Sequence, residues 1–346
     1  MLLYSITFAV AFALTFVLTP VARTFAIKFG IVDAPGKRKI HTKPIPRFGG
    51  IPLFIGFIIS VTVGMLLALI QSKQFDFRLI IGVISGVLVL FAIGVIDDKN
   101  PLPAWKKFIF QIIAATITFY FGVRIGFVSN PFGNFLEIPF MISLGLTLFW
   151  IVGVTNAINL IDGLDGLATG VSAIAAIALF IVALRTHQIE AAILLIALIG
   201  AAIGFLKYNF NPASIFLGDS GSYMLGFILA ATSVMGVLKS TLVVALVIPI
   251  LILGVPIFDT LTVILKRILA RQNIFKADMR HLHHNMLGAG MTQRQVVLII
   301  YAVCVFLSLG ALIMTAINGI FALVVLVGMI IVVVTLFNIL RINIEG

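Results

Sequence analysis

The sequence predicts an all-helical protein that crosses a membrane many times, and its composition and patterning carry this prediction. Hydrophobic residues make up 62% of the 346 residues, and charged residues only 10%. Soluble globular domains hold roughly 45–50% apolar and about 25% charged residues, so a soluble, disordered or fibrous class is excluded. Apolar stretches of about 20 residues recur along the whole chain, as membrane-crossing helices require. Helices also satisfy their own backbone hydrogen bonds where water is absent.

We expect one transmembrane domain, residues 1–346, with about eleven spans. Their expected ranges are about 4–22, 49–70, 79–96, 108–126, 140–158, 169–185, 190–206, 221–237, 241–258, 296–315 and 319–339. The first span lacks a preceding basic stretch and a following small-residue cleavage site, so we expect it to remain as an anchor.

The loops between these spans form two sets that differ in charge. The first set is short and bland: 71–78, 127–139, 186–189, 238–240 and 316–318. The second set is polar: 23–48, 97–107, 159–168, 207–220, 259–295 and the C-terminus. Of the 23 lysines and arginines, 18 fall on the second set and 5 on the first. Because Lys and Arg collect on the cytoplasmic side, we expect the N-terminus outside and the C-terminus and second set inside.

The net charge and the remaining composition limit the partners. A net charge of +11 indicates contact with anionic lipid headgroups. It does not indicate nucleic acid, because the basic residues lie on separate loops. The single Cys304 excludes a disulfide framework and a cysteine zinc cage. Faces rich in Gly and Ala permit a homodimer without requiring one.

The few acidic residues indicate where chemistry occurs. Of only 12, six on the second set of loops lie close to span ends: Asp97, Asp98, Asp162, Asp165, Asp219 and Asp259. A carboxylate at such depth is costly and is usually functional. Solvation in a loop is an adequate explanation for one aspartate, but six on one side favour a shared site.

Asp97 and Asp98 form the first cluster of this site. Adjacent carboxylates repel and need a counter-charge, such as a lysine or a metal ion. Mg²⁺, alone or with a diphosphate, suits such a pair because it prefers oxygen ligands and keeps several waters. Lys107, at the start of the next span, is placed to reach back to a phosphate. A helix-end cap is the alternative explanation of the pair.

Two further clusters combine aspartates with glycines. Asn159, Asp162 and Asp165 follow a span at spacings of three, so Asn159 and Asp162 share a face if the helix continues there. Asp219 lies just before another span, where a helix N-terminus can meet an anion and the carboxylate can hold a metal ion that bridges the same phosphates. An ordinary helix N-cap is the alternative for Asp219.

The fourth cluster is basic: Arg280, His281, His283 and His284. No carboxylate or Cys lies beside these histidines at a zinc-site spacing. An arginine and imidazoles can instead bind phosphate, or the amide and hydroxyls of a sugar. For Asp259, pairing with Lys266 or Arg267 is at least as good an explanation as a direct role.

Together these clusters, with the basic loop at residues 33–41 and the Pro-Arg-Phe-Gly-Gly sequence at 46–50, resemble the polyprenyl-phosphate N-acetylhexosamine-1-phosphate transferase family. The resemblance covers the whole chain and is greatest to the WecA/TagO-like branch of this glycosyltransferase 4 type. Phospho-MurNAc-pentapeptide translocase is a more distant relative. Two departures stand out: Lys99-Asn100-Pro101 follows the aspartate pair, and Trp105 stands where relatives often have lysine, which makes Lys107 a better phosphate ligand than Lys106.

The resemblance implies transfer of N-acetylglucosamine 1-phosphate from UDP-N-acetylglucosamine to undecaprenyl phosphate, with release of UMP. It implies Mg²⁺, with Mn²⁺ as a substitute, and a site on the cytoplasmic face of a bacterial plasma membrane. The roles it assigns are catalytic for Asp97, Asp98 and Lys107; metal-binding for Asp219, Asn159 and Asp162; nucleotide-binding for Asp165, Asn209 and Phe216; and sugar- or phosphate-binding for Arg280, His281, His283, His284, Lys43 and Arg47.

Two alternatives remain open from the sequence. In the first alternative, the same reaction uses a different UDP-sugar as donor, such as the N-acetylgalactosamine or the muramoyl-pentapeptide derivative. The second is a cation-coupled transporter that uses the same acidic residues. A transporter, however, places its charges near the bilayer midplane, whereas these lie at span ends.

Overall fold

The computed structural model describes residues 1–33, 44–129, 135–237, 244–272, 281–317, 321–322, 324–330 and 332. These residues are mostly helical, which confirms the all-helical prediction. The helices are α1 (Leu2–Lys28), α2 (Gly50–Ile70), α3 (Phe77–Lys99), α4 (Ala104–Tyr120), α5 (Phe140–Leu160), α6 (Leu167–Arg185), α7 (Ile189–Asn209), α8 (Gly218–Val237), α9 (Val244–Ile252), α10 (Gly254–Leu269), α11 (Leu282–Gly288) and α12 (Gln293–Met314). Two short antiparallel hairpins interrupt them: β1 (Val32–Asp33) with β2 (Ile45–Pro46), and β3 (Phe127–Ser129) with β4 (Phe135–Glu137).

Within the described residues, seven helices are long and apolar enough to cross a membrane: α1, α2, α3, α5, α6, α7 and α12. The chain is therefore a multi-pass membrane protein, as its composition predicts. The number of spans, expected to be about eleven, stays a prediction. The predicted tenth span matches α12, whereas most of the predicted eleventh lies outside the described residues.

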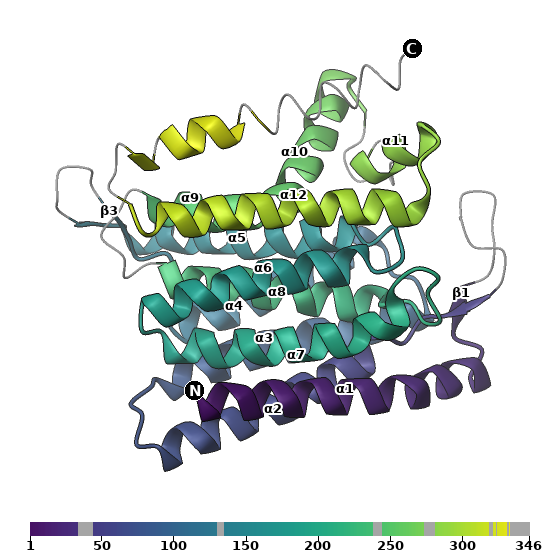
Figure 1. Ribbon diagram of the computed structural model, residues 1–346, viewed down its shortest axis with the longest axis horizontal. Helices are drawn as coiled ribbons and strands as arrows, with labels where there is room; N and C mark the ends of the chain where they lie inside the picture. The colour runs from purple at the N-terminus through teal and green to yellow at the C-terminus, as the bar shows by residue number, and fades with distance from the viewer. Residues whose placement is uncertain are drawn as a thin grey trace.

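The ninth predicted span, 241–258, is wrong as a single helix. The chain breaks between α9 and α10 at Leu253, and α10 leaves the direction of the bundle and continues to Leu269 (Figure 1). Pro256 explains the break, because proline has no N–H to bond the carbonyl four residues earlier and its ring clashes with that carbonyl. In the first turn of a new helix that missing N–H costs nothing. Residues 259–269, at the start of the expected loop 259–295, are therefore helical.

The other helices run lengthwise and define two ends of the bundle (Figure 1). One end is formed by the β1–β2 hairpin, α11 and the turns 100–103, 161–166 and 210–217, and we call it the site end. The opposite end carries the N-terminus of α1 and the β3–β4 hairpin. Successive long helices alternate in direction. The described parts of the polar loops expected from the sequence therefore lie together at the site end.

Helix α8 lies at the centre of the bundle. It packs against α2, α3, α5, α6, α7 and α9. Its apolar side chains are fully buried around the helix, as Met224, Phe227 and Leu229 illustrate with no exposed area. A helix that is apolar on all sides belongs in the interior. The other site-end elements are therefore arranged around the N-terminus of α8.

Glycines allow α2 and α3 to approach that N-terminus closely. A Cβ at Gly94 in α3 would lie 2.4 Å from the Ser220 Cα, and a Cβ at Gly50 in α2 would lie 2.5 Å from the Gly221 backbone nitrogen. Real Cβ atoms do not approach backbone atoms this closely, so larger residues would force these helices apart. The close approach brings the end of α3, with its two aspartates, onto α8.

Candidate active site

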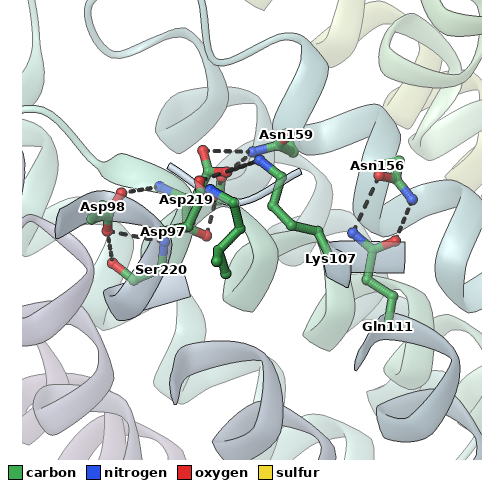
Figure 2. Close-up of polar contacts among 10 residues, drawn as sticks. Asp97, Asp98, Lys107, Gln111, Asn156, Asn159, Asp219 and Ser220 are labelled. Carbon is green, nitrogen blue, oxygen red and sulfur yellow. Dashed lines mark hydrogen bonds and ion pairs between the residues drawn. The ribbon is translucent and has the colours of Figure 1, made fainter. Parts of the chain in front are cut away.

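Lys107 lies at the centre of the site, between two carboxylates from different helices. Its Nζ donates to Oδ2 of Asp219, at 2.9 Å, and to Oδ2 of Asp97, at 3.2 Å (Figure 2). The side chains of Lys107 and Asp97 are mostly buried, with 22% and 10% of their areas exposed. The second Asp97 oxygen accepts from the backbone N–H of Leu102 at 2.7 Å. Lys107 thus supplies a counter-charge to Asp97 and Asp219, whereas its predicted contact with a phosphate stays a prediction.

Asp98 holds the N-terminus of α8 rather than facing Lys107. Its Oδ1 accepts from the backbone N–H of Asp219 at 2.7 Å, and its Oδ2 accepts from the Ser220 N–H at 3.2 Å and from Ser220 Oγ at 2.5 Å. Gly218 has a φ of +75°, and a Cβ there would lie 2.6 Å from the Asp98 carboxylate. Asp98 is therefore an N-cap supplied by a neighbouring helix, which fits the favourable field at a helix N-terminus. A catalytic role for it stays a prediction.

Asn159, from the last turn of α5, reaches the same aspartate as Lys107. Its Nδ2 donates to Asp219 Oδ1 at 3.2 Å and to Ser222 Oγ at 2.8 Å. Both carboxylate oxygens of Asp219 thus have donors from other helices, one from α4 and one from α5. Tyr223, buried one turn after Asp219, places its ring 5.9 Å from Lys107 Nζ. The sequence analysis missed Tyr223, although its spacing of four from Asp219 puts both on one helical face.

Asp162 lies in the turn after α5, not on the helix. The shared face of Asn159 and Asp162 is expected only if the helix continues there, and α5 ends at Leu160. The turn begins with the Asp162 N–H donating to the Asn159 carbonyl at 3.2 Å. Burial, and then the negative charges of Asp219 and Asp98, raise the pKa of Asp162 to about 8. Asp162 therefore lies close enough to Asp98 of α3 and Asp219 of α8 for their negative charges to disfavour its ionised form.

The loop 210–217 uses two of the residues expected to bind the nucleotide. Asp165 Oδ2 accepts from Asn211 Nδ2 at 3.0 Å and from the Ala213 N–H at 2.9 Å. Asn209 is buried; its amide accepts from Thr169 Oγ1 at 2.8 Å and donates to the Ile215 carbonyl at 3.1 Å. Both side chains thus hold the loop in shape, and their contact with a nucleotide stays a prediction.

The β1–β2 hairpin docks on the same loop and places Arg47 at the site end. The Phe216 N–H donates to the Pro46 carbonyl at 2.8 Å, and the Gly49 N–H donates to the Phe216 carbonyl at 3.0 Å. Arg47 forms an ion pair with Asp33 at 2.9 Å, and its charge opposes the rise in the Asp162 pKa. Phe216 is partly buried beside this hairpin. Its stacking role and the phosphate role of Arg47 stay predictions.

The histidine cluster is anchored by Asp259, a residue that the sequence leaves ambiguous. Asp259 Oδ2 lies 2.8 Å from His281 Nδ1, and its Oδ1 accepts from the Leu282 N–H at 2.8 Å. Both contacts join α10 to the start of α11, across a part of the chain outside the described residues. Asp259 thus holds His281 and the start of α11 against α10.

His283 contacts the turn that carries Asp162. A Cβ at Gly163 would lie 2.4 Å from His283 Nε2, so only glycine leaves room for the imidazole. Burial, and then the neighbouring His284, lower the pKa of His283 to about 3. Its Nε2 is buried without a hydrogen-bond partner. A neutral imidazole with an unused nitrogen suits a sugar hydroxyl or amide better than it suits charge neutralisation.

Two predicted site residues, Lys43 and Arg280, lie outside the described residues. The other basic candidates, Arg47, His281, His283 and His284, all lie at the site end. The described residues thus bring the aspartates of three loops, Lys107 and three histidines to one end of the bundle.

The residues at the site end fit a hydrated divalent cation. In the described part of the chain, no three His, Cys, Asp or Glu side chains are grouped so that they could hold an ion without other ligands. Mg²⁺ does not need such a group, because it keeps several waters and binds one or two carboxylates together with substrate phosphates. Asp97 and Asp219 place two carboxylates around the single ammonium of Lys107, and this excess of negative charge favours a cation.

Comparison with known proteins agrees with this architecture. The family model for glycosyl transferase family 4 matches residues 80–237, which include Asp97, Lys107, Asn159 and Asp219. A probable undecaprenyl-phosphate N-acetylglucosaminyl 1-phosphate transferase of Bacillus subtilis is 38% identical over 91% of this chain and 86% of the relative. A decaprenyl-phosphate N-acetylglucosaminephosphotransferase of Mycolicibacterium smegmatis is 35% identical over 84% of this chain and 76% of the relative.

A phospho-N-acetylmuramoyl-pentapeptide-transferase of Clostridium acetobutylicum is also similar, with 32% identity over 90% of this chain and 98% of the relative. These relatives match 84–91% of this chain. The shared sequence and the site at the N-terminus of α8 lead to one conclusion: the chain belongs to glycosyl transferase family 4.

Proposed function

We propose that this protein transfers N-acetylglucosamine 1-phosphate from UDP-N-acetylglucosamine to undecaprenyl phosphate, giving undecaprenyl-diphosphate-N-acetylglucosamine and UMP. This is the first membrane step of a cell-wall or surface glycan. The Bacillus subtilis relative is named for this carrier and sugar, and the mycobacterial relative for the same sugar.

The buried Lys107 bridge between Asp97 and Asp219 is the observation that carries the proposal. The reaction brings a phosphate monoester next to a diphosphate, so like charges must approach closely. A fixed ammonium flanked by carboxylates from two other helices is an arrangement that can exchange carboxylate partners for phosphate oxygens. Fixed charges of this kind stabilise developing negative charge without reorganising in the reaction.

We further propose that Asp219, with Asn159 and Asp162, would hold Mg²⁺, for which Mn²⁺ can substitute. When bound, the ion supplies charge neutralisation at the donor diphosphate. Asp219 supports this role because two donors fix its carboxylate in place. Lys107 and Arg47 add positive charge on either side.

In the reaction that we propose, an oxygen of the carrier phosphate attacks the phosphorus that bears the sugar. A new P–O bond forms to the carrier as the P–O bond to UMP breaks, and the electron pair of that bond leaves on the UMP phosphate. Asp97 orients the attacking phosphate through Lys107. One phosphoanhydride replaces another, so the reaction should run readily in both directions. A covalent sugar phosphate on Asp97, detected during turnover with labelled donor, would overturn direct attack.

The remaining residues recognise the donor. Asp165, Asn209 and Phe216 belong to the elements that shape the nucleotide subsite, directly or by holding the loop 210–217. His281, His283, His284 and Arg280 recognise the sugar and its phosphate, and Lys43 and Arg47 the phosphates. His283 supports this arrangement, because its buried Nε2 has no hydrogen-bond partner among the described residues.

For the topology, we propose about eleven spans in the bacterial plasma membrane, with the N-terminus outside and the C-terminus in the cytoplasm. The site end then faces the cytoplasm, where UDP-sugars are soluble, and lies where a lipid phosphate meets water. The distribution of Lys and Arg supports this orientation. Membrane lipids surround the bundle, and its small-residue faces permit a homodimer. Nucleic acid is not a partner.

The test uses detergent-purified protein, Mg²⁺, undecaprenyl phosphate and UDP-N-acetylglucosamine, with UMP release as the readout. Wild type should release UMP, and both the Asp219→Ala variant and the addition of EDTA should abolish release. Release only from UDP-N-acetylgalactosamine or the UDP-muramoyl-pentapeptide would overturn the donor but keep the reaction. Folded protein that releases UMP from no donor would overturn the proposal and favour the transporter.

A further inference from the structure

We propose that Gln111 of α4 and Asn156 of α5 form a positioning pair that sets the register of these two helices for catalysis. This inference rests on the proposed function, because its effect is exerted through Lys107 and Asn159. The proposed reaction gives neither residue a role. Neither residue contacts Asp219; each acts through a neighbour on its own helix.

The two side-chain amides bond each other in both directions (Figure 2). Gln111 Nε2 donates to Asn156 Oδ1 at 3.2 Å, and Asn156 Nδ2 donates to Gln111 Oε1 at 2.6 Å. Asn156 Nδ2 also donates to the Val152 carbonyl of its own helix at 2.8 Å. Gln111 is only 2% exposed. A buried amide must find partners, and here each amide satisfies the other across the α4–α5 contact.

Helical spacing connects this pair to the site. Lys107 precedes Gln111 by four residues and Asn159 follows Asn156 by three, so each lies one turn away on the same helical face. Lys107 donates to Asp219 Oδ2 at 2.9 Å, and Asn159 donates to Asp219 Oδ1 at 3.2 Å. The amide pair therefore joins α4 to α5 directly, and one turn away both helices contact Asp219 of α8.

A hydrogen-bonded amide pair fixes the rotation and sliding of two helices, which apolar packing alone does not fix. Between membrane helices, lipid tails compete with apolar side chains, so apolar contacts specify rotation and sliding poorly. A buried polar pair is directional and fixes register, as single buried asparagines do in coiled coils. Asn159 has a short side chain, so a small rotation of α5 would remove it from Asp219.

The distinguishing variant replaces both amides: Gln111→Leu with Asn156→Leu. Replacing both partners of a hydrogen bond by apolar groups is nearly neutral for stability. We therefore expect a folded protein with an unchanged melting temperature but a kcat about 10- to 100-fold lower, because displacement by about 1 Å costs that much in a reaction. The KM for the UDP-sugar should change little. A double leucine variant with the wild-type kcat would overturn the proposal.

A second variant tests whether the combined length of the two amide side chains matters. Gln111→Asn with Asn156→Gln moves one methylene from α4 to α5 and keeps the summed length and both amides. It should recover most of the kcat that the single Gln111→Asn variant loses. Failure of this exchange to recover kcat in a folded protein would contradict the pair as the source of the effect.

The matched control is a polar contact of α5 with a neighbouring helix that lies outside the site. Trp150 Nε1 donates to Ser233 Oγ of α8 at 2.9 Å, further from the site end. Ser233→Ala removes this contact and should leave kcat unchanged. A loss of kcat as large as that of the double leucine variant would show that any interhelical polar contact of α5 matters, and would overturn a special role for the pair.

A readout without turnover separates this inference from the proposed function. An amine-reactive ester labels lysines, and site-resolved mass spectrometry compares Lys107 with the exposed Lys106 beside it. The pair of carboxylates should protect Lys107 in wild type, and the double leucine variant should label several-fold faster at Lys107 alone. If wild type releases no UMP, this result still tests the pair; unchanged labelling would overturn it.

Discussion

The two ends of the bundle both carry aspartates with basic partners, but they use them differently. At the opposite end, Asp76 bonds Arg78, two residues away, and their side chains are 37% and 79% exposed. At the site end, Asp219 bonds Lys107, which is 112 residues distant, and their side chains are 27% and 22% exposed. The first pair is a local cap of α3, whereas the second joins helices that only the fold brings together.

This difference shows why charge alone does not mark a functional site. An exposed pair between near neighbours contributes little, because water and salt screen it. A mostly buried pair between distant helices is costly to assemble, and removal of one partner leaves an uncompensated charge. The site end should therefore respond strongly to substitution and the opposite end weakly, and substitutions at four positions test this contrast.

The largest effect is expected at the centre of the site. Lys107→Met removes the ammonium and leaves Asp97 and Asp219 without their counter-charge. We expect a loss of about 10²- to 10³-fold in kcat, as for the removal of one fixed charge-stabilising donor. Steady-state UMP release is the measurement, and Lys106→Met is the control one residue away. A Lys107→Met enzyme with more than a tenth of wild-type activity would break the comparison.

The next effect concerns the cap of α8. Asp98→Ala removes three hydrogen bonds to Asp219 and Ser220, of which Ser220 supplies two. We expect the protein to lose about 3 kcal/mol of stability, because hydrogen bonds to charged groups contribute about 1.5–3 kcal/mol each and losses are partly shared. Thermal unfolding in detergent measures this loss.

Asp98→Asn sharpens that result. The amide oxygen still accepts at the helix N-terminus, so it should restore part of the stability. If Asp98→Asn is as stable as wild type but inactive, Asp98 takes part in the reaction as well as capping α8. Recovery of both properties would make it a positioning residue.

A smaller effect is expected where the histidine segment meets the turn after α5. Gly163→Ala places a Cβ 2.4 Å from His283 Nε2 and must displace the imidazole. We expect the KM for the UDP-sugar to rise about tenfold, in line with the loss of one or two recognition contacts. Gly153→Ala in α5 is the matched control, because nothing lies within 4 Å of its Cβ position. Equal KM values for the two variants would contradict a donor role for His283.

The smallest effect is expected at the opposite end. Asp76→Ala removes the N-cap of α3 and should cost about 1 kcal/mol, with kcat unchanged. The hydrogen bond from Arg78 lowers the pKa of Asp76, so this stabilisation is present at neutral pH and is lost as the pH falls through that lowered pKa. Melting curves of wild type and variant should therefore converge in acid. A large loss of activity would break the contrast between the two ends.

Much of the site could be predicted from the sequence because its residues are unusual in an apolar chain. Asp97, Asp98, Asp162, Asp165 and Asp219 stand out where charges are costly, and Lys107 stands out as a cation at the start of the next apolar span. The break before α10 could also have been predicted, because Pro256 lies inside the ninth apolar run. Hydropathy alone does not register a missing N–H, so the run was interpreted as one helix.

Other features could not be predicted, because they depend on distances between helices. Asp98 is adjacent to Asp97 and has the same side chain, so the sequence does not distinguish their roles, yet Asp98 caps α8. Asp259 has two basic neighbours within its own helix, yet it bonds His281 on α11. Gln111 and Asn156 carry no charge and satisfy each other only after α4 and α5 have packed.

The sequence by itself determined the membrane class, the helical architecture and the residue types available for chemistry, because burial costs for charges and apolar lengths act locally along the chain. Only the tertiary structure decided which carboxylate receives Lys107, which one caps α8, and which glycines leave room for a neighbouring helix or imidazole. Those outcomes depend on contacts a few ångströms long between residues roughly a hundred positions apart, and no local preference encodes them.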